Sequence, residues 1–209
     1  MHRIYVESNF VLELLLEQDD ATSCRELLGL ASAGTVELVL SGLALMEAHF
    51  KVASGEMRER VTKFLADERK ALSRSSETAD LREAMLAVQT GLPSLKAVHQ
   101  QRFDTEVENL QKLTRLIYPG SKAISAACEP SFRHDLSWKD AVHLETAIED
   151  LELRPPMGEA TFVSTDKAFA DPDVKARLRG HKCIVVSSFR GAVAALKRLD
   201  VPGSGGPPT

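Results

Sequence analysis

The chain has 209 residues, with 30 acidic and 26 basic side chains, and a formal net charge of −4 when its histidines are neutral. A chain of this length with 44% hydrophobic residues can bury its own core, which excludes intrinsic disorder and a small disulfide-stapled scaffold. The acidic balance is unlike that of proteins that coat nucleic acids non-specifically, which are strongly basic.

The cysteines and the hydropathy of the chain indicate the cellular compartment in which the protein is expected. The three cysteines, Cys24, Cys128 and Cys183, form no Cys-x-x-Cys pair, which is typical of reduced thiols. No apolar run approaches the roughly 20 residues needed to cross a bilayer, and the first apolar run is too short before Glu7 for a secretory signal. We therefore expect a cytoplasmic protein without a membrane segment.

The first 50 residues alternate between strand and helix patterns. Short apolar runs at residues 3–6 and 36–40 predict β-strands, each followed by residues with helical spacing. In the helix after the second strand, Leu43, Met46, Glu47 and Phe50 are separated by steps of three and four, which predicts that Glu47 shares an inward face with these apolar residues.

Residues 51–119 interrupt this alternation, and we interpret them as a helical insertion without a strand. Between residues 51 and 118 there are 12 basic and 10 acidic side chains, a balance of +2 against −6 for the remainder. Lys63, Lys70 and Arg74 can share one helix face, so they are candidate phosphate contacts. An ordinary solvated face stays open, because Asp67 and Glu68 lie among them.

The alternation resumes after residue 120. A helix is predicted from the Ser137 cap to about residue 150, followed by strands at 161–164 and 183–186 and a last helix at 190–199. These patterns predict an α/β fold, a Rossmann-like parallel sheet in an α/β/α sandwich, as one domain over residues 1–200. The Gly- and Pro-rich segment 201–209 is expected to be a disordered tail.

Four acidic residues are predicted at the carboxyl edge of this sheet, where ligands gather in open parallel sheets. Glu7 ends the first strand, Glu47 and Asp140 lie in the helices described above, and Asp166 follows the strand at 161–164. Converging carboxylates repel one another unless a cation neutralises them, and Mg²⁺ and Mn²⁺ prefer oxygen ligands. The arrangement therefore predicts metal-dependent phosphodiester hydrolysis.

Each acid also has a structural interpretation. Asp140 lies three residues after Ser137 and could complete a capping box, Glu47 could be a partly exposed helix acid, and Asp166 could be a turn residue. Glu7 is the hardest of the four to explain in this way, because it ends an apolar strand and precedes an apolar helix.

The segments around these acids resemble the four motif regions of PIN-domain ribonucleases, in order. They are Val6–Leu12, Leu45–Glu47, Leu136–His143 and Val163–Phe169, and the similarity covers about residues 3–50 and 130–199. Most PIN domains open with Asp, whereas a bacterial PIN-like subgroup opens with a Glu-Thr-Asn-Phe type of segment similar to Glu7–Phe10. Glu7 is one methylene longer than Asp, so a metal would lie farther from the strand.

The resemblance implies a Mg²⁺ or Mn²⁺ site formed by Glu7, Glu47, Asp140 and Asp166 and cleavage of single-stranded RNA. Ser8 and Asn9 match the small polar pair after the first acid, and Ser164 matches the hydroxyl residue two places before the last, so Asn9 and Ser164 are expected substrate contacts. His143 and Trp138 are expected to pack, although contacts of His143 with substrate and of Trp138 with a base stay open.

The resulting expectation is a metal-dependent endoribonuclease of a toxin, RNA-processing or defence system. Two alternatives stay open: a catalytically degenerate scaffold whose insertion binds a protein partner, and a phosphoesterase for a small molecule. RNA is the expected partner, while an antitoxin and a homodimer are not decided by the residues.

Overall fold

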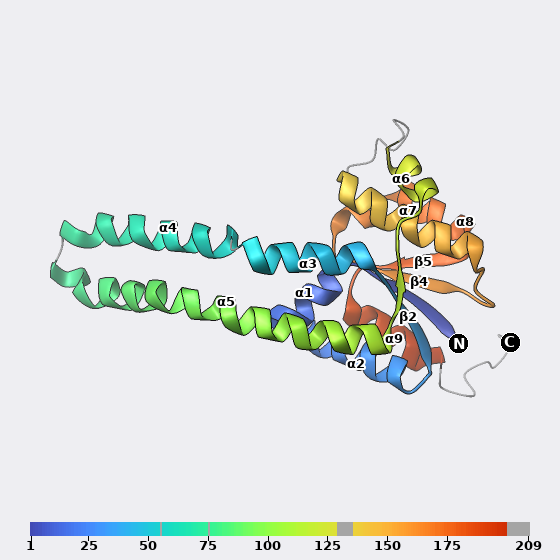
Figure 1. The fold of residues 1–209 in the computed structure, drawn as a ribbon, viewed down its shortest axis with the longest axis horizontal. Coiled ribbons are helices and arrows are strands. Elements are labelled where there is room, and N and C mark those ends of the chain that lie inside the picture. Colours follow the sequence, from blue (N-terminus) through green and yellow to red (C-terminus); the bar gives the residue numbers. More distant parts are fainter. Residues whose placement is uncertain (55, 75, 129–135, 200–209) are drawn as a thin grey trace, which may run out of the picture.

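The computed structural model describes residues 1–54, 56–74, 76–128 and 136–199. Its centre is a five-stranded sheet in which every neighbouring pair is parallel, in the order β3-β2-β1-β4-β5 (Figure 1). The strands are β1 (His2–Val6), β2 (Val36–Ser41), β3 (Arg115–Ile117), β4 (Ala160–Val163) and β5 (Cys183–Val186). The predicted α/β fold is confirmed.

The order of the strands determines where a site can form. The chain enters at the central strand β1, continues outward to β2 and β3, and then crosses to β4 and β5 on the other side. The strand order therefore reverses between β1 and β4, where Val6 pairs with Val163. Residues that follow these two strands, Glu7 and Ser164, lie at the crevice where doubly wound sheets bind ligands.

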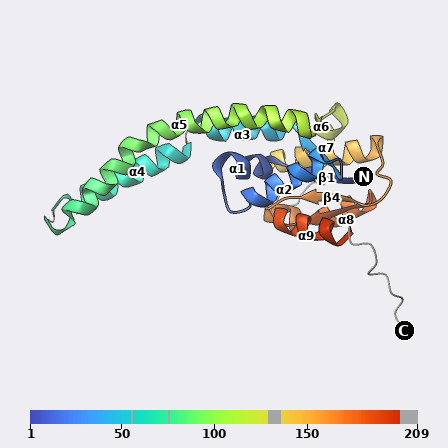
Figure 2. The same ribbon diagram turned by 90° about the horizontal axis from the view of Figure 1, so that it is seen from below.

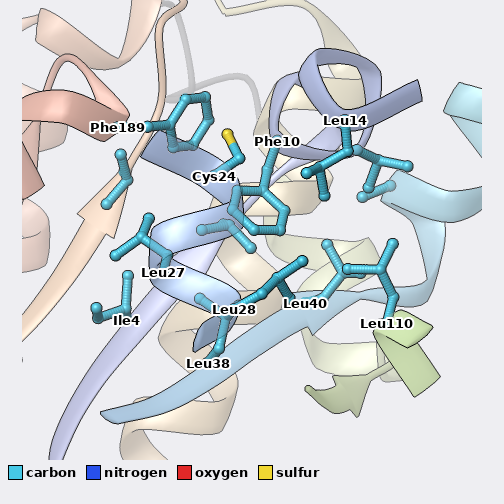
Figure 3. Packing of buried hydrophobic residues seen from close by; sticks show 14 of the residues in the cluster. Ile4, Phe10, Leu14, Cys24, Leu27, Leu28, Leu38, Leu40, Leu110 and Phe189 are labelled. Carbon is cyan, nitrogen blue, oxygen red and sulfur yellow. The ribbon is translucent and has the colours of Figure 1, made fainter. Parts of the chain in front are cut away.

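Helices cover both faces of the sheet, as predicted for the sandwich. Side chains alternate along the strands, so that Ile4 and Val6 lie in one apolar cluster and Tyr5 in the other. The first cluster contains Phe10, Leu27 and Phe189 (Figure 3), from α1, α2 and α9. The second is covered by α7 and α8.

The helices of the body have the following bounds: α1 (Ser8–Leu16), α2 (Ala21–Ser32), α3 (Gly42–Ser54), α6 (Ser121–Ala127), α7 (Trp138–Leu153), α8 (Pro172–Gly180) and α9 (Phe189–Leu199), with a 3-10 turn η3 (Lys167–Ala170). Gly34 adopts a φ of 71° between α2 and β2, a conformation that favours glycine. Two elements differ from expectation: α6 forms before the Ser137 cap, where no helix was predicted, and β3 lies within 51–119, where no strand was predicted.

A long helical hairpin projects from the body (Figures 1 and 2). It consists of α4 (Glu56–Ala71), the 3-10 turns η1 (Leu72–Arg74) and η2 (Ser76–Thr78), and α5 (Ala79–Leu113). The 35 residues of α5 correspond to a length of about 52 Å. Leu110 is fully buried in the first cluster, so the end of α5 anchors the hairpin to the body. We call residues 56–98 the arm.

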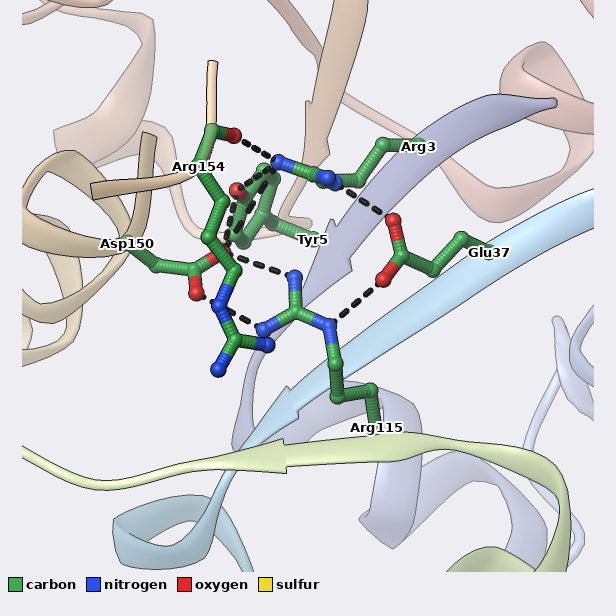
Figure 4. Close-up of polar contacts among 6 residues, drawn as sticks. All are labelled: Arg3, Tyr5, Glu37, Arg115, Asp150 and Arg154. Atoms are coloured by element: carbon green, nitrogen blue, oxygen red, sulfur yellow. Dashed lines mark hydrogen bonds and ion pairs between the residues drawn. The ribbon is translucent and has the colours of Figure 1, made fainter. Parts of the chain in front are cut away.

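A polar network holds the short edge strand β3 (Figure 4). It includes Arg3 near the start of β1, whereas Glu7 follows the end of that strand. Arg115 donates from Nε to Glu37 at 2.5 Å and from both terminal nitrogens to Asp150 at 2.7 and 2.8 Å. Arg3 donates to the other oxygen of Glu37 at 2.6 Å, and the Tyr5 hydroxyl donates to Asp150 at 2.7 Å. The network therefore connects β1, β2, β3 and α7.

Two further expectations concern a membrane-spanning segment and the C-terminal residues. The described part of the chain contains no helix whose length and hydropathy would let it span a bilayer. The predicted disorder of residues 201–209 lies outside the described residues.

Candidate active site

Glu7 is a buried carboxylate at the point where β1 ends and α1 begins. Its side chain is the N-cap of α1 and accepts the backbone N–H of Asn9 at 2.8 Å. The Ser8 hydroxyl donates to the same oxygen at 2.9 Å, and the Ser164 hydroxyl donates to the other oxygen at 3.2 Å. Only 4% of Glu7 is exposed, and it forms no ion pair with a described residue.

Burial raises the pKa of Glu7, although the hydrogen bonds from Asn9, Ser8 and Ser164 and the proximity of His143 oppose this shift. Desolvation penalises the charged form, and here the partners in direct contact are uncharged donors. A cation beside this carboxylate would offset the penalty.

Glu47, on α3, is the second buried carboxylate, and each of its oxygens contacts a nitrogen of another side chain. His143 Nε2 lies 2.9 Å from one oxygen and Lys139 Nζ lies 3.0 Å from the other. Burial alone would raise the pKa of Glu47, but the contacts with His143 and Lys139 lower it to about 2. Ser8, whose hydroxyl donates to Glu7, lies close enough to Glu47 to lower this pKa further.

The apolar face predicted for Glu47 is wrong. Met46 and Phe50 are 56% and 64% exposed, whereas the buried face of α3 contains Ala44, Ala48 and Val52 beside Glu47. Small side chains face the body because α3 packs closely against α1 and α5. Glu47 is therefore buried through its polar contacts and not by the residues that suggested its burial.

Asp140 and Asp166 lie at the same edge of the sheet, but their carboxylates make local hydrogen bonds. Asp140 accepts the Ser137 hydroxyl at 2.6 Å, and Ser137 in turn caps α7 by accepting the Asp140 N–H. Asp166 caps η3 by accepting the N–H of Ala168 at 2.9 Å, while its own N–H donates to Ser164. Asp166 is therefore a capping residue at a turn, whereas Asp140 bonds to the Ser137 hydroxyl and no bond from the Ser137 backbone N–H completes a capping box in the described chain.

The structure thus connects the predicted residues through hydroxyl groups. Ser164 contacts Glu7 and the backbone of Asp166, and Ser8 donates its hydroxyl to Glu7 near Glu47. No group of three or more His, Cys, Asp or Glu side chains in the described ranges is placed so that it could hold a metal ion. The metal role of the four acids stays a prediction.

The chemistry of two of these acids nevertheless fits a hard divalent ion. Mg²⁺ is commonly held by one or two carboxylates together with water and substrate phosphates, so a third protein carboxylate is not required. Glu7 and Glu47 supply four carboxylate oxygens around the Ser8 hydroxyl. Glu7, which lacks a charged partner among the described residues, is the more available of the two.

Two residues at the site were not predicted as site residues. His143 is 3% exposed and its ring contacts Glu47, and Nδ1 is buried without a hydrogen-bond partner in the described part of the chain. The same ring lines a small cavity of about 10 Å³, with Glu7 and Ser41 among its walls. In the sequence, His143 could have been identified as a site residue from its spacing, because it lies three residues, or about one helical turn, after Asp140. Lys139, beside Asp140 in sequence, carried no such signal.

Trp138 was expected to pack, and that expectation is wrong. Its side chain is 55% exposed in the first turn of α7, directly before Lys139. A large exposed aromatic ring therefore lies next to the predicted acidic residues.

The basic candidates lie elsewhere. Lys63 and Lys70 are exposed on α4 in the arm, away from the sheet edge (Figure 1). The side chain of Arg74 lies outside the described part of the structure. Asn9 and Ser164 belong to the Glu7 network through the backbone N–H and the hydroxyl, respectively.

Comparisons with known proteins give no relative: no family model, no curated protein and no solved structure matches the chain.

Proposed function

We propose that the chain is a Mg²⁺- or Mn²⁺-dependent endoribonuclease of the PIN-like family that cuts single-stranded RNA at the carboxyl edge of the sheet. The observation that carries this proposal is Glu7, a buried carboxylate at the point of strand reversal that has only uncharged partners among the described residues. Burying a carboxylate in this way is costly for folding. A role in holding a cation explains why the site contains it.

The residues around Glu7 would fix its orientation. Ser8 and Asn9 hold one oxygen and Ser164 holds the other, so the carboxylate has a defined plane. Glu47 is kept ionised by His143 and Lys139. The chemistry that a divalent ion supplies to phosphodiester hydrolysis is activation of water and neutralisation of charge at phosphorus.

Lys139 and Trp138 are the groups with which the chain would contact RNA at this edge. The Lys139 ammonium bridges the acidic site and solvent, because its side chain is 57% exposed while it contacts Glu47. It can therefore move to a substrate phosphate when Glu47 takes a metal ligand role. The exposed Trp138 ring can stack on a base, an interaction that tolerates any sequence.

Single-turnover cleavage of an unstructured RNA tests this proposal. Wild type is expected to cleave with Mn²⁺ or Mg²⁺ and not with EDTA, and Glu7→Gln is expected to lower the rate at least about 100-fold, because it removes the charge but keeps the size. Glu59→Gln, at an exposed position of α4, is the charge-matched control. Cleavage in EDTA at the wild-type rate, or by Glu7→Gln, would contradict the proposal.

A second function is favoured by the ion pairs of Glu47. Both of its oxygens already have a partner, the Lys139 ammonium and the His143 ring, so this carboxylate is stabilised without a metal. The alternative is a non-catalytic scaffold of the same fold that binds a protein through the arm. The two functions differ in metal binding, since the scaffold does not require an ion.

A further inference from the structure

We propose that a basic hollow on the arm binds the phosphate backbone of RNA, at a site separate from the sheet edge. The hollow lies between α4, η1 and the start of α5, has a volume of about 740 Å³, and is lined by Arg69, Lys70 and Arg82. The choice of RNA over another polyanion rests on the proposed function. The binding itself does not require catalysis.

The charges in the hollow favour an anionic ligand. Three cationic side chains line it and Glu83 is the one acidic residue among its described walls. None of the three cations forms an ion pair with a described residue, although the arm contains many acids. The Arg82 Nε is buried without a hydrogen-bond partner in the described part of the chain. Within the described chain this Nε–H has no acceptor, so the Arg82 guanidinium is not held at Nε by a protein group with which a bound anion would compete.

The residue types match phosphate in particular. Each guanidinium presents parallel N–H donors that fit two oxygens of one phosphate, and two such groups, from α4 and α5, line the same hollow. The remaining walls include the apolar side chains of Ala66 and Leu86, and the described walls contain no aromatic ring on which a base could stack. The site would therefore contact the backbone without reading the sequence.

The position of the hollow explains why a strand, and not a small anion, is the expected ligand. Arg82 precedes the buried Leu110 by 28 residues of α5, which corresponds to about 42 Å along the helix. A chain of phosphates can extend along the arm from the hollow toward the body, which a small anion cannot do. Both ends of such a strand would be held, one at the arm and one at the sheet edge.

The test measures binding of a labelled, unstructured 20-nucleotide RNA by fluorescence anisotropy in EDTA, over a range of salt concentrations. Arg69→Gln/Arg82→Gln is expected to weaken binding about 10-fold and to reduce the slope of log affinity against log salt by about 1.4, the value for two lost phosphate contacts. Lys51→Gln/Arg60→Gln removes two exposed charges outside the hollow and is expected to change affinity less than twofold. Circular dichroism and thermal melting establish that both variants are folded.

The outcomes separate this inference from the proposed function. Equal losses in the two double variants, or an unchanged salt slope for Arg69→Gln/Arg82→Gln, would overturn the arm site. The arm site would also be overturned if a polyglutamate peptide, added at the same concentration of negative charge as the RNA, displaced the RNA. That result would favour an acidic protein partner. Equal binding of a DNA strand supports recognition of phosphate. If Glu7→Gln cleaves as wild type while the arm effects hold, the proposed function fails and the arm site stands.

Discussion

Glu7 and Glu47 both lie near Ser8, yet burial raises the pKa of the first while His143 and Lys139 lower that of the second. The difference follows from their partners, because Glu7 contacts neutral donors and Glu47 contacts the Lys139 ammonium and the His143 ring. Neighbouring acids whose pKa values diverge are typical of sites at which one group stays ionised and the other exchanges its proton or its cation. The same difference predicts opposite effects of pH on stability.

The Glu7→Gln variant is expected to remove a pH-dependent loss of stability. The folded-state pKa of Glu7 is raised, so the folded protein binds more protons than the unfolded chain, and wild-type stability falls as pH rises from the ordinary Glu range through the raised pKa. Urea unfolding in EDTA from pH 4 to pH 8 measures this. The difference in unfolding free energy, Glu7→Gln minus wild type, should increase with pH. A difference that is constant across this range would contradict the pKa shift.

Glu47→Gln is expected to have the opposite pH dependence. The pKa of Glu47 is lowered to about 2, so its stabilising contribution is present above its ordinary value of 4.5 and is lost as pH falls toward 2. At neutral pH the variant should lose about 2 kcal/mol, the range for hydrogen bonds to charged groups, and the loss should shrink on acidification. The same urea series checks this, with Glu59→Gln as control, and a loss that grows at low pH would contradict it.

At the scale of single residues, the sequence predicted the four acids but not their partners. Glu7 was identifiable because a charge ends an apolar strand, and Ser164 because it follows the adjacent strand. The pairing of Glu47 with His143 joins residues 96 positions apart, and no local pattern indicates it. Asp140 and Asp166 have both a local hydrogen-bonding role and a predicted site role, because the residue types that cap a helix are also metal ligands.

Among the secondary-structure elements, the strands of four or more residues were predictable, and β3 was not. Arg115–Ile117 has only three residues and follows a 35-residue helix, so its pattern is too short to differ from the end of that helix. β3 is a strand because Leu116 and its neighbours pair with β2 and because Arg115 contacts Glu37 and Asp150. Its stability therefore depends on contacts between distant segments.

Arg115→Gln is expected to destabilise the protein by about 2 kcal/mol, because it leaves Glu37 and Asp150 partly buried with fewer donors. Burial would raise the pKa of Asp150, and the hydrogen bonds from Arg115 and Tyr5 hold it below its ordinary value. Hydrogen exchange of the Arg115→Gln variant should show that protection relative to wild type falls more in β3 than in β1.

Arg25→Gln, which breaks an exposed ion pair with Glu17, is the control and is expected to have a small effect. Equal destabilisation by the two variants, or unchanged protection of β3, would show that the network does not hold this strand.

For the whole molecule, a divalent ion should act as a stabilising ligand. Mn²⁺ or Mg²⁺ at about 100 times its dissociation constant contributes about 2.7 kcal/mol, which for a chain of this size raises the thermal midpoint by roughly 5–10 °C. The rise should be absent in Glu7→Gln and present in Glu59→Gln. A wild-type midpoint that is indifferent to both ions would favour the scaffold function.

The arm places its basic hollow apart from the carboxyl edge of the sheet. The sequence indicated only that this segment is helical. The apolar positions from residue 56 onward have helical spacing, but many of them are exposed, among them Phe64, Leu81 and Val88. An isolated helical hairpin has too few neighbours to bury them, so periodicity alone could not distinguish a projecting arm from a packed domain. The core contacts of Leu110 and Phe103 mark where the arm ends.

Trp138 is the single tryptophan of the chain, and it is half exposed beside Lys139 at the sheet edge. The protein consequently has an intrinsic optical reporter whose emission responds to its immediate surroundings. An oligonucleotide that stacks on this indole should quench its emission, whereas one held only in the hollow of the arm should leave the spectrum unchanged. Ultraviolet fluorescence of the unlabelled protein can thus tell which of the two surfaces a short RNA occupies first.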